Sequence, residues 1–73
     1  MKYTLAIIRE LIAEENTRRG FTDVKYNTIG AIRLYQAYGE YALDEVINAG
    51  GGVRRLTGLG NKNEIGEYIA EMN

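Results

Sequence analysis

The chain has 73 residues, of which 45% are hydrophobic and 26% are charged, and its formal net charge is −1. This length predicts one small domain, residues 1–73, whose core buries only about 60% of the surface of the unfolded chain. Because the sequence contains no cysteine and no histidine, disulfides and zinc cannot stabilise that domain. Helix packing or self-association is therefore expected to add the missing stability.

The residue types that are absent also narrow the function. Cys, His, Pro, Trp and Ser do not occur. The two commonest nucleophiles and the commonest general base are therefore missing, as are the nitrogen and sulfur ligands that zinc, copper and haem prefer. We expect the protein not to be an enzyme, and we expect no cofactor and no metal site.

Hydropathy gives no indication of a membrane segment or a signal peptide. The longest apolar run, Leu5–Ile8, is much shorter than the ~20 residues of a membrane span. The first residues lead directly into an amphipathic pattern that contains Glu10 and Glu14, which is unlike the apolar stretch of a signal peptide. We expect a cytoplasmic protein without membrane association, in agreement with the absence of cysteine.

The first element expected along the chain is a helix over residues 3–19. Leu5, Ile8 and Ile12 lie on one face at helical spacing, and charged residues take the opposite face. Gly20 follows a pair of arginines and occupies the position where glycine commonly ends a helix.

A second helical pattern begins at Asn27 or Thr28 and runs to Ala49, after an ambiguous connection over residues 21–27. Four of its side chains share a helical face: Ala31, Leu34, Tyr35 and Tyr38. Gly39 either ends the first half of this pattern or lies inside a continuous helix. The sequence leaves these two interpretations open.

Glycines divide the last third of the chain. Gly50–Gly52 stops the second pattern, Val53–Leu56 is expected to form one helical turn, and Gly58–Gly60 is a second break. Asn61 and Glu64 have the spacing of a capping box ahead of a final helix. The fold class expected is all-α, a compact single domain of four to five short helices with no confident strand.

Tyrosines and basic residues suggest a surface for a protein partner. Three tyrosines are spaced by three residues, and residues 50–63 contain three basic side chains and no acidic one. Tyrosine is enriched at interfaces, although a core that lacks Trp could use the same rings at its rim. The candidate partner-binding residues are Tyr35, Tyr38, Tyr41, Arg54, Arg55 and Lys62.

The segment Thr57–Lys62 suggests a second kind of site. Its glycine-leucine-glycine turn resembles the hairpin of helix-hairpin-helix DNA-binding modules, whose backbone N–H groups hold a DNA phosphate. The resemblance covers Ala42–Met72 and implies that Gly58, Gly60 and Lys62 bind phosphate, with nucleic acid as the partner. A sequence pI near 5.3 argues against a dedicated DNA-binding domain, and an ordinary connection between two helices explains the same glycines.

A looser resemblance concerns the residues after Tyr41. The order A-L-x-x-V-I-x-x-G-G-G-x-x-x-L, followed by a terminal helix, is similar to the C-terminal half of assorted small bacteriophage and prophage proteins. This resemblance implies a small accessory protein in the cytoplasm of the host cell, which acts by binding a host or phage component.

Three hypotheses for the function follow. The leading hypothesis is a non-catalytic protein-interaction module, an accessory or inhibitor protein of a phage or mobile element, whose partner is a protein of unknown identity. The first alternative is a small nucleic-acid-binding module that uses the Gly58–Lys62 turn. The second alternative is a structural subunit that assembles into a homo-oligomer.

Overall fold

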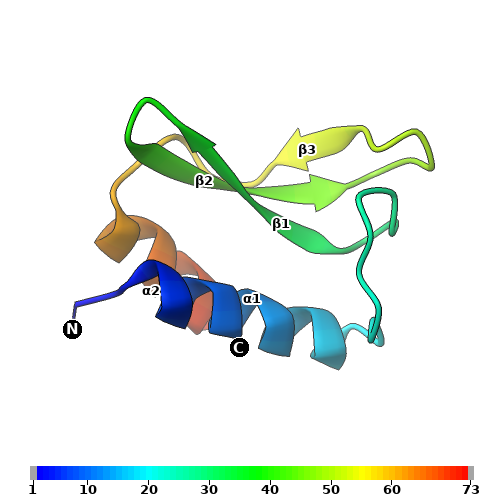
Figure 1. Cartoon of the computed structure of the whole chain (residues 1–73), viewed down its shortest axis with the longest axis horizontal. Helices are drawn as coiled ribbons and strands as arrows, with labels where there is room; N and C mark the ends of the chain where they lie inside the picture. The colour runs from blue at the N-terminus through cyan, green and yellow to red at the C-terminus, as the bar shows by residue number, and fades with distance from the viewer. Residues whose placement is uncertain (1, 73) are drawn as a thin grey trace.

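The chain forms a helix, a three-stranded antiparallel sheet and a second helix (Figure 1). The computed structural model describes residues 2–72. The elements are α1 (Leu5–Arg18), β1 (Ile32–Ala37), β2 (Glu40–Val46), β3 (Val53–Arg55) and α2 (Lys62–Met72). The strands lie in the order β1-β2-β3, each antiparallel to the next. The fold is therefore α+β, and the expectation of an all-α helical bundle without strands is wrong.

Helix α1 confirms the first helix that the sequence predicts. The hydroxyl of Thr4 caps its N-terminus by accepting a hydrogen bond from the backbone N–H of Ile7 at 3.2 Å. Ile8 and Ile12 are buried on the face of the helix that meets the core. The helix ends before Gly20, whose φ of +93° is a conformation that glycine adopts readily.

Strands β1 and β2 replace the helix expected over residues 27–49. Tyr38 and Gly39 have φ values of 54° and 76°, and they form a two-residue turn. Ala37 therefore pairs directly with Glu40, and the antiparallel register extends from this pair along both strands. Gly39 thus turns a hairpin, and neither interpretation of it as part of a helical segment is correct.

The wrong prediction for this segment has a physical reason. Apolar residues in β1 fit two periods at once, since Ile32 and Leu34 also have the two-residue spacing of a strand face. The central strand β2 is buried on both faces, so that Ala42, Leu43 and Asp44 are all buried in succession. Such a strand shows no alternation of polar and apolar residues, and its sequence is hard to distinguish from a buried helix.

The glycine segment 50–52 joins two strands. Gly51 has a φ of +86°, and the side-chain oxygen of Asn48 accepts hydrogen bonds from the amides of Gly50 and Gly52 at 3.0 and 2.9 Å. The following residues, Val53–Arg55, pair with β2 as strand β3. The helical turn expected over residues 53–56 is therefore also wrong.

Both helices lie on the same side of the sheet (Figure 1). Side chains from α1, α2 and the facing side of the sheet form one apolar core. Its buried members are Ile8, Ile12, Ile32, Leu43, Ile65 and Ile69. Because both helices lie on this side, no helix of residues 2–72 covers the opposite face of the sheet.

Helix α2 begins with the capping box that the sequence predicts. The amide of Glu64 donates to Asn61 Oδ1 at 2.9 Å, and the amide of Asn61 donates to Glu64 Oε1 at 3.2 Å. Across residues 2–72, neither helix combines the length and the apolar character needed to cross a membrane.

Candidate functional site

The face of the sheet opposite the helices is not covered by either helix of residues 2–72 (Figure 1). Neighbouring residues of a strand point to opposite faces. Because Ile32 and Leu43 belong to the core, the residues beside them in β1 and β2 lie on the other face, and the pairing extends this face to β3. We call it the outer sheet face. Its residues are Arg33, Tyr35, Ala42, Asp44, Val53 and Arg55.

An arginine, a carboxylate and a tyrosine ring are held together at the centre of the outer sheet face. Asp44 is only 5% exposed and pairs across the strands with Arg33 on one side and Arg55 on the other. Arg55 Nε donates to Asp44 Oδ1 at 2.6 Å, and the guanidinium carbon of Arg55 lies 4.3 Å from the centre of the Tyr35 ring. The ion pair and the cation–π contact fix the Arg55 side chain over the sheet.

Tyr38 occupies the tip of the β1–β2 hairpin and is 99% exposed. Its φ of 54° lies in the left-handed region, where glycine, asparagine and aspartate are the residues usually found. A bulky side chain in this region costs about 1–2 kcal/mol, and an almost fully exposed ring recovers little of that energy by packing. The tip therefore displays an aromatic side chain that the fold does not need.

The structure divides the other predicted residues between two further places. Tyr41 lies on the helix side of the sheet, where it is half-buried against the core. Tyr41 and Lys62 line one shallow hollow beside the start of α2, together with Lys2 and Tyr3. The tyrosines at positions 35, 38 and 41 do not form a single stripe, because the turn at residues 38–39 reverses the chain between them.

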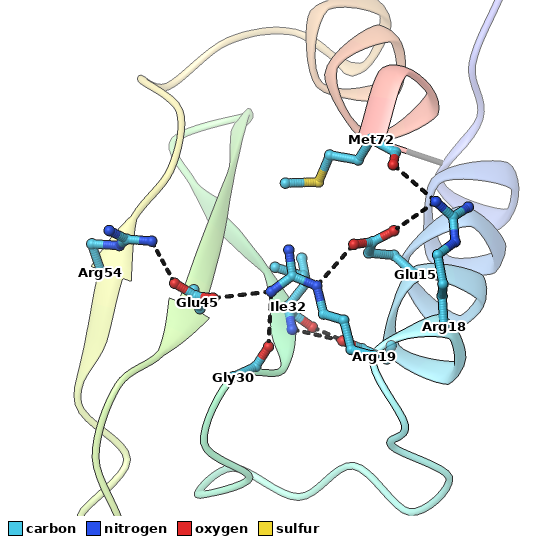
Figure 2. A network of polar contacts seen from close by, with 9 residues as sticks. Glu15, Arg18, Arg19, Gly30, Ile32, Glu45, Arg54 and Met72 are labelled. Carbon is cyan, nitrogen blue, oxygen red and sulfur yellow. Dashed lines mark hydrogen bonds and ion pairs between the residues drawn. The ribbon is translucent and has the colours of Figure 1, made fainter.

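Arg54 belongs to a polar network on the helix side of the sheet (Figure 2). Arg54 Nη2 donates to Glu45 Oε1 at 2.6 Å. The other oxygen of Glu45 accepts from Arg19 at 2.9 Å, and Arg19 also donates to Glu15 at 2.8 Å and to the carbonyl of Gly30 at 3.1 Å. Arg54 thus contributes to the contact between the end of α1 and the sheet.

The charges of Glu45 and Arg19 stabilise each other in this network. Burial raises the pKa of Glu45, but the hydrogen bonds from Arg54 and Arg19 and their positive charges outweigh it, so that the pKa of this carboxyl lies below its ordinary value. The hydrogen bond to Glu15 raises the pKa of Arg19; burial acts in the opposite direction, and the contact with Glu45 raises the pKa again.

The glycine turn expected to hold phosphate has a different geometry from a helix-hairpin-helix module. The amide of Gly60 donates to the carbonyl of Tyr41 at 2.9 Å, and the amide of Tyr41 donates to the carbonyl of Gly60 at 2.8 Å. The Gly60 N–H is therefore used within the protein. Strand β3 occupies the position of the first helix of such a module. Of the other two residues expected to bind phosphate, Gly58 lies in an open loop and Lys62 lies at the start of α2.

Comparing the chain with protein-family models, with curated proteins and with solved structures found no match. Among residues 2–72, no group of three side chains of the kind that holds a metal ion is found together.

Sequence reasoning missed Arg33 and Asp44, which share the outer sheet face with Tyr35 and Arg55. Both are adjacent to apolar residues and resemble ordinary surface charges in a helical interpretation. The signal that identifies them is the turn at residues 38–39: once this turn is assigned, counting outward from it places Arg33 opposite Asp44.

Proposed function

We propose that this protein is a non-catalytic protein-interaction module, of the accessory or inhibitor kind, which binds its partner through the outer sheet face and the Tyr38 tip. The partner is a protein. Binding requires no nucleophile, general base or cofactor, which accords with the residue types that the chain uses.

The observation that carries this proposal is the conformation of Tyr38. Asparagine followed by glycine is the preferred sequence for a two-residue hairpin turn, whereas this turn has tyrosine at the first position with a φ of 54°. The local rule is broken without a packing contact that compensates for it, since the ring is 99% exposed. Residues that break local rules in this way concentrate at functional sites.

The Tyr35–Arg55 pair supports the same conclusion. Tyrosine and arginine are the residue types that most often dominate the binding energy of an interface. Here the ion pair with Asp44 holds Arg55 before any partner arrives, so that little side-chain entropy is lost on binding. Val53, which is also exposed on this face, adds apolar area beside the pair.

The test is affinity capture with matched variants. The protein and its Tyr38→Asn and Arg55→Ala variants are immobilised, incubated with a cell lysate, and compared by quantitative mass spectrometry. The control is Tyr68→Asn, which removes a tyrosine that is 39% exposed on α2. We expect at least one protein to be retained by the parent and by the control, and to be lost with both Tyr38→Asn and Arg55→Ala. An unchanged set of captured proteins for all four baits would refute the proposal.

A second experiment separates protein binding from the nucleic-acid alternative. Labelled duplex and single-stranded DNA are titrated with the protein at about 50 and 200 mM salt. We expect no change in fluorescence anisotropy. Binding that weakens steeply with salt and is lost in Lys62→Glu would favour a nucleic-acid partner instead.

A further inference from the structure

The outward edge of β1 is open over half of its length. β1 is the first strand of the sheet, with β2 on one side and no strand of residues 2–72 on the other. In an antiparallel pair the backbone groups of successive residues point alternately toward and away from the partner strand. Leu43, which lies opposite Leu34, uses its amide and carbonyl on the β3 side, bonding Thr57 and Leu56 at 3.1 and 2.8 Å. Leu34 and, two residues on, Gln36 therefore present their backbone groups to the outer edge.

At one residue of this edge, Ile32, a side chain already forms the hydrogen bonds that a neighbouring strand would form. The amide of Ile32 donates to Asn16 Oδ1 at 2.7 Å, and Asn16 Nδ2 donates back to the carbonyl of Ile32 at 3.1 Å. Asn16 lies on α1 and is only 4% exposed. Its carboxamide thus replaces one peptide unit of a neighbouring strand. No such replacement is found for Leu34 or Gln36 among the hydrogen bonds of residues 2–72.

An apolar groove of about 410 Å³ runs beside the open edge, between α1, the connection after it and β1. Six apolar side chains line it: Ile12, Ala13, Phe21, Val24, Ile32 and Leu34. The charged side chains at the groove are Arg9 and Arg33, and no acidic side chain lines it. The ion pairs found among residues 2–72 involve other basic residues, so that both guanidinium groups are available to a ligand.

We infer that the groove and the open edge of β1 bind an extended acidic segment of a partner protein as a fourth strand of the sheet. The backbone of this segment pairs with Leu34 and Gln36. Apolar side chains on one face of the segment enter the groove, and its carboxylates meet Arg9 and Arg33. This surface shares Arg33 with the outer sheet face, but it uses the groove and the edge of β1, and it does not depend on the function proposed for that face.

The charges at the groove also indicate why a second copy of the chain is a poor occupant. If two copies paired through Leu34 and Gln36, Arg9 and Arg33 of both copies would add to the positive charge of one joint surface, and no acidic side chain lines the groove to offset it. Like charges brought together in this way oppose association. An acidic peptide neutralises the same groups.

The inference is tested with two synthetic probes, an eight-residue peptide that alternates valine with glutamate and its counterpart with lysine in place of glutamate. Two-dimensional NMR spectra of the labelled protein report binding, and amide exchange reports on Leu34 and Gln36 directly. We expect these two amides to exchange fast in the free protein and to become protected by the glutamate peptide. The lysine peptide is expected to leave them unchanged.

Matched variants identify the edge and the charges. Gln36→Pro removes an outward N–H without removing a hydrogen bond to β2, and Gln36→Thr is its control. We expect Gln36→Pro and the double variant Arg9→Glu/Arg33→Glu each to weaken binding at least about tenfold, and Gln36→Thr and Tyr38→Asn to bind as the parent does. The arginine variants replace surface side chains, so that they keep the test decisive if proline perturbs the strand.

Three outcomes would overturn the inference. The first is the absence of any spectral change at peptide concentrations up to about 1 mM. The second is equal binding of the lysine peptide. The third is a concentration-dependent dimer that disappears in Gln36→Pro, which would assign the edge to a second copy of the chain.

Discussion

The ring of Tyr3 packs against the backbone of Gly66 in α2. A Cβ added to Gly66 would lie 2.5 and 2.6 Å from the Cδ1 and Cδ2 atoms of that ring, closer than any real contact. The amide of Tyr3 donates to Asn63 Oδ1 at 2.9 Å, which holds the segment before α1 across the first turn of α2. The segment before α1 is thus held against α2 by the Tyr3 ring, which packs where Gly66 has no side chain.

Gly66→Ala tests this contact. Alanine favours a helix over glycine by about 1 kcal/mol, but the clash with Tyr3 is expected to outweigh this gain and lower the free energy of unfolding by about 1–3 kcal/mol. Urea denaturation measures the change. In a Tyr3→Ala background the same substitution should cost less or become stabilising, and Gly58→Ala, where a Cβ has open space, serves as the control. Equal losses in both backgrounds would mean that the ring does not contact Gly66.

Tyr38→Asn is expected to stabilise the protein while removing a residue of the proposed interface. Asparagine tolerates the left-handed conformation better than tyrosine, so that the free energy of unfolding should rise by about 0.5–1 kcal/mol. For a domain of this size, 1 kcal/mol corresponds to a rise in Tm of about 4–8 °C. Calorimetry measures it. Tyr38→Ala removes the ring but keeps the Cβ and should show no such gain; destabilisation by Tyr38→Asn would contradict the account of the turn.

Arg19 and Arg18 are adjacent arginines with unequal roles. Arg19 donates to Glu15, Gly30 and Glu45, whereas the half-exposed Arg18 donates to the carbonyl of Met72. Lysine cannot reproduce the planar fork of a guanidinium. Arg19→Lys is therefore expected to cost about 1–3 kcal/mol of stability, and Arg18→Lys less than about 0.5 kcal/mol, in matched denaturant titrations. Similar losses for both would show that the network contributes little.

The lowered pKa of Glu45 predicts a loss of stability in acid. The folded protein binds a proton at this carboxyl more weakly than the unfolded chain does. Its contribution is therefore complete above the ordinary glutamate pKa of about 4.3 and is lost as the pH falls through the lower folded value. Glu45→Gln should reduce stability at neutral pH and flatten its dependence on pH in this range.

The comparison variant for this experiment is Glu10→Gln, which replaces an exposed glutamate outside the ion pairs found among residues 2–72. Thermal unfolding is followed from acid to neutral pH for the parent and both variants. If Glu10→Gln flattened the profile as much as Glu45→Gln, the acid sensitivity would belong to the overall charge and not to the network.

Both ends of the fold could be predicted from the sequence because their signals are local. Gly20 marks the end of α1 by its backbone conformation, and the pair Asn61 and Glu64 marks the start of α2 by two short hydrogen bonds. Such signals depend on three or four neighbouring residues and not on the rest of the molecule.

The sheet could not be predicted in the same way because strand pairing is decided by tertiary contacts. Ala42 and Asp44 are buried on the face away from the helices, and Leu43 between them is buried on the other face. This pattern fits a central strand only when both neighbouring strands are known. The local signal for the hairpin turn is the dipeptide Tyr38-Gly39. It is a weak signal, because the first position of such a turn is usually asparagine and here is tyrosine.

The candidate site, like the sheet, depends on tertiary contacts and could not be predicted from local signals. Tyr35 and Arg55 are brought together by the register of three strands, a relationship that no spacing in the sequence expresses. Tyr35 and Tyr41 are separated by the turn and lie on opposite faces, so that the helical stripe proposed for them does not exist. Residue types alone identify candidate side chains, but the strand register determines which of them lie side by side.

The two-residue turn at Tyr38 and Gly39 also limits how this protein can change during evolution. A single inserted or deleted residue between β1 and β2 would shift the register by one position and exchange the faces of every side chain in one strand, which would bury Arg33 and expose Ile32. Divergence of the outer sheet face is therefore restricted to replacing side chains at fixed positions. Descendants of this chain can vary this face residue by residue, but the register between β1 and β2 has to be inherited unchanged.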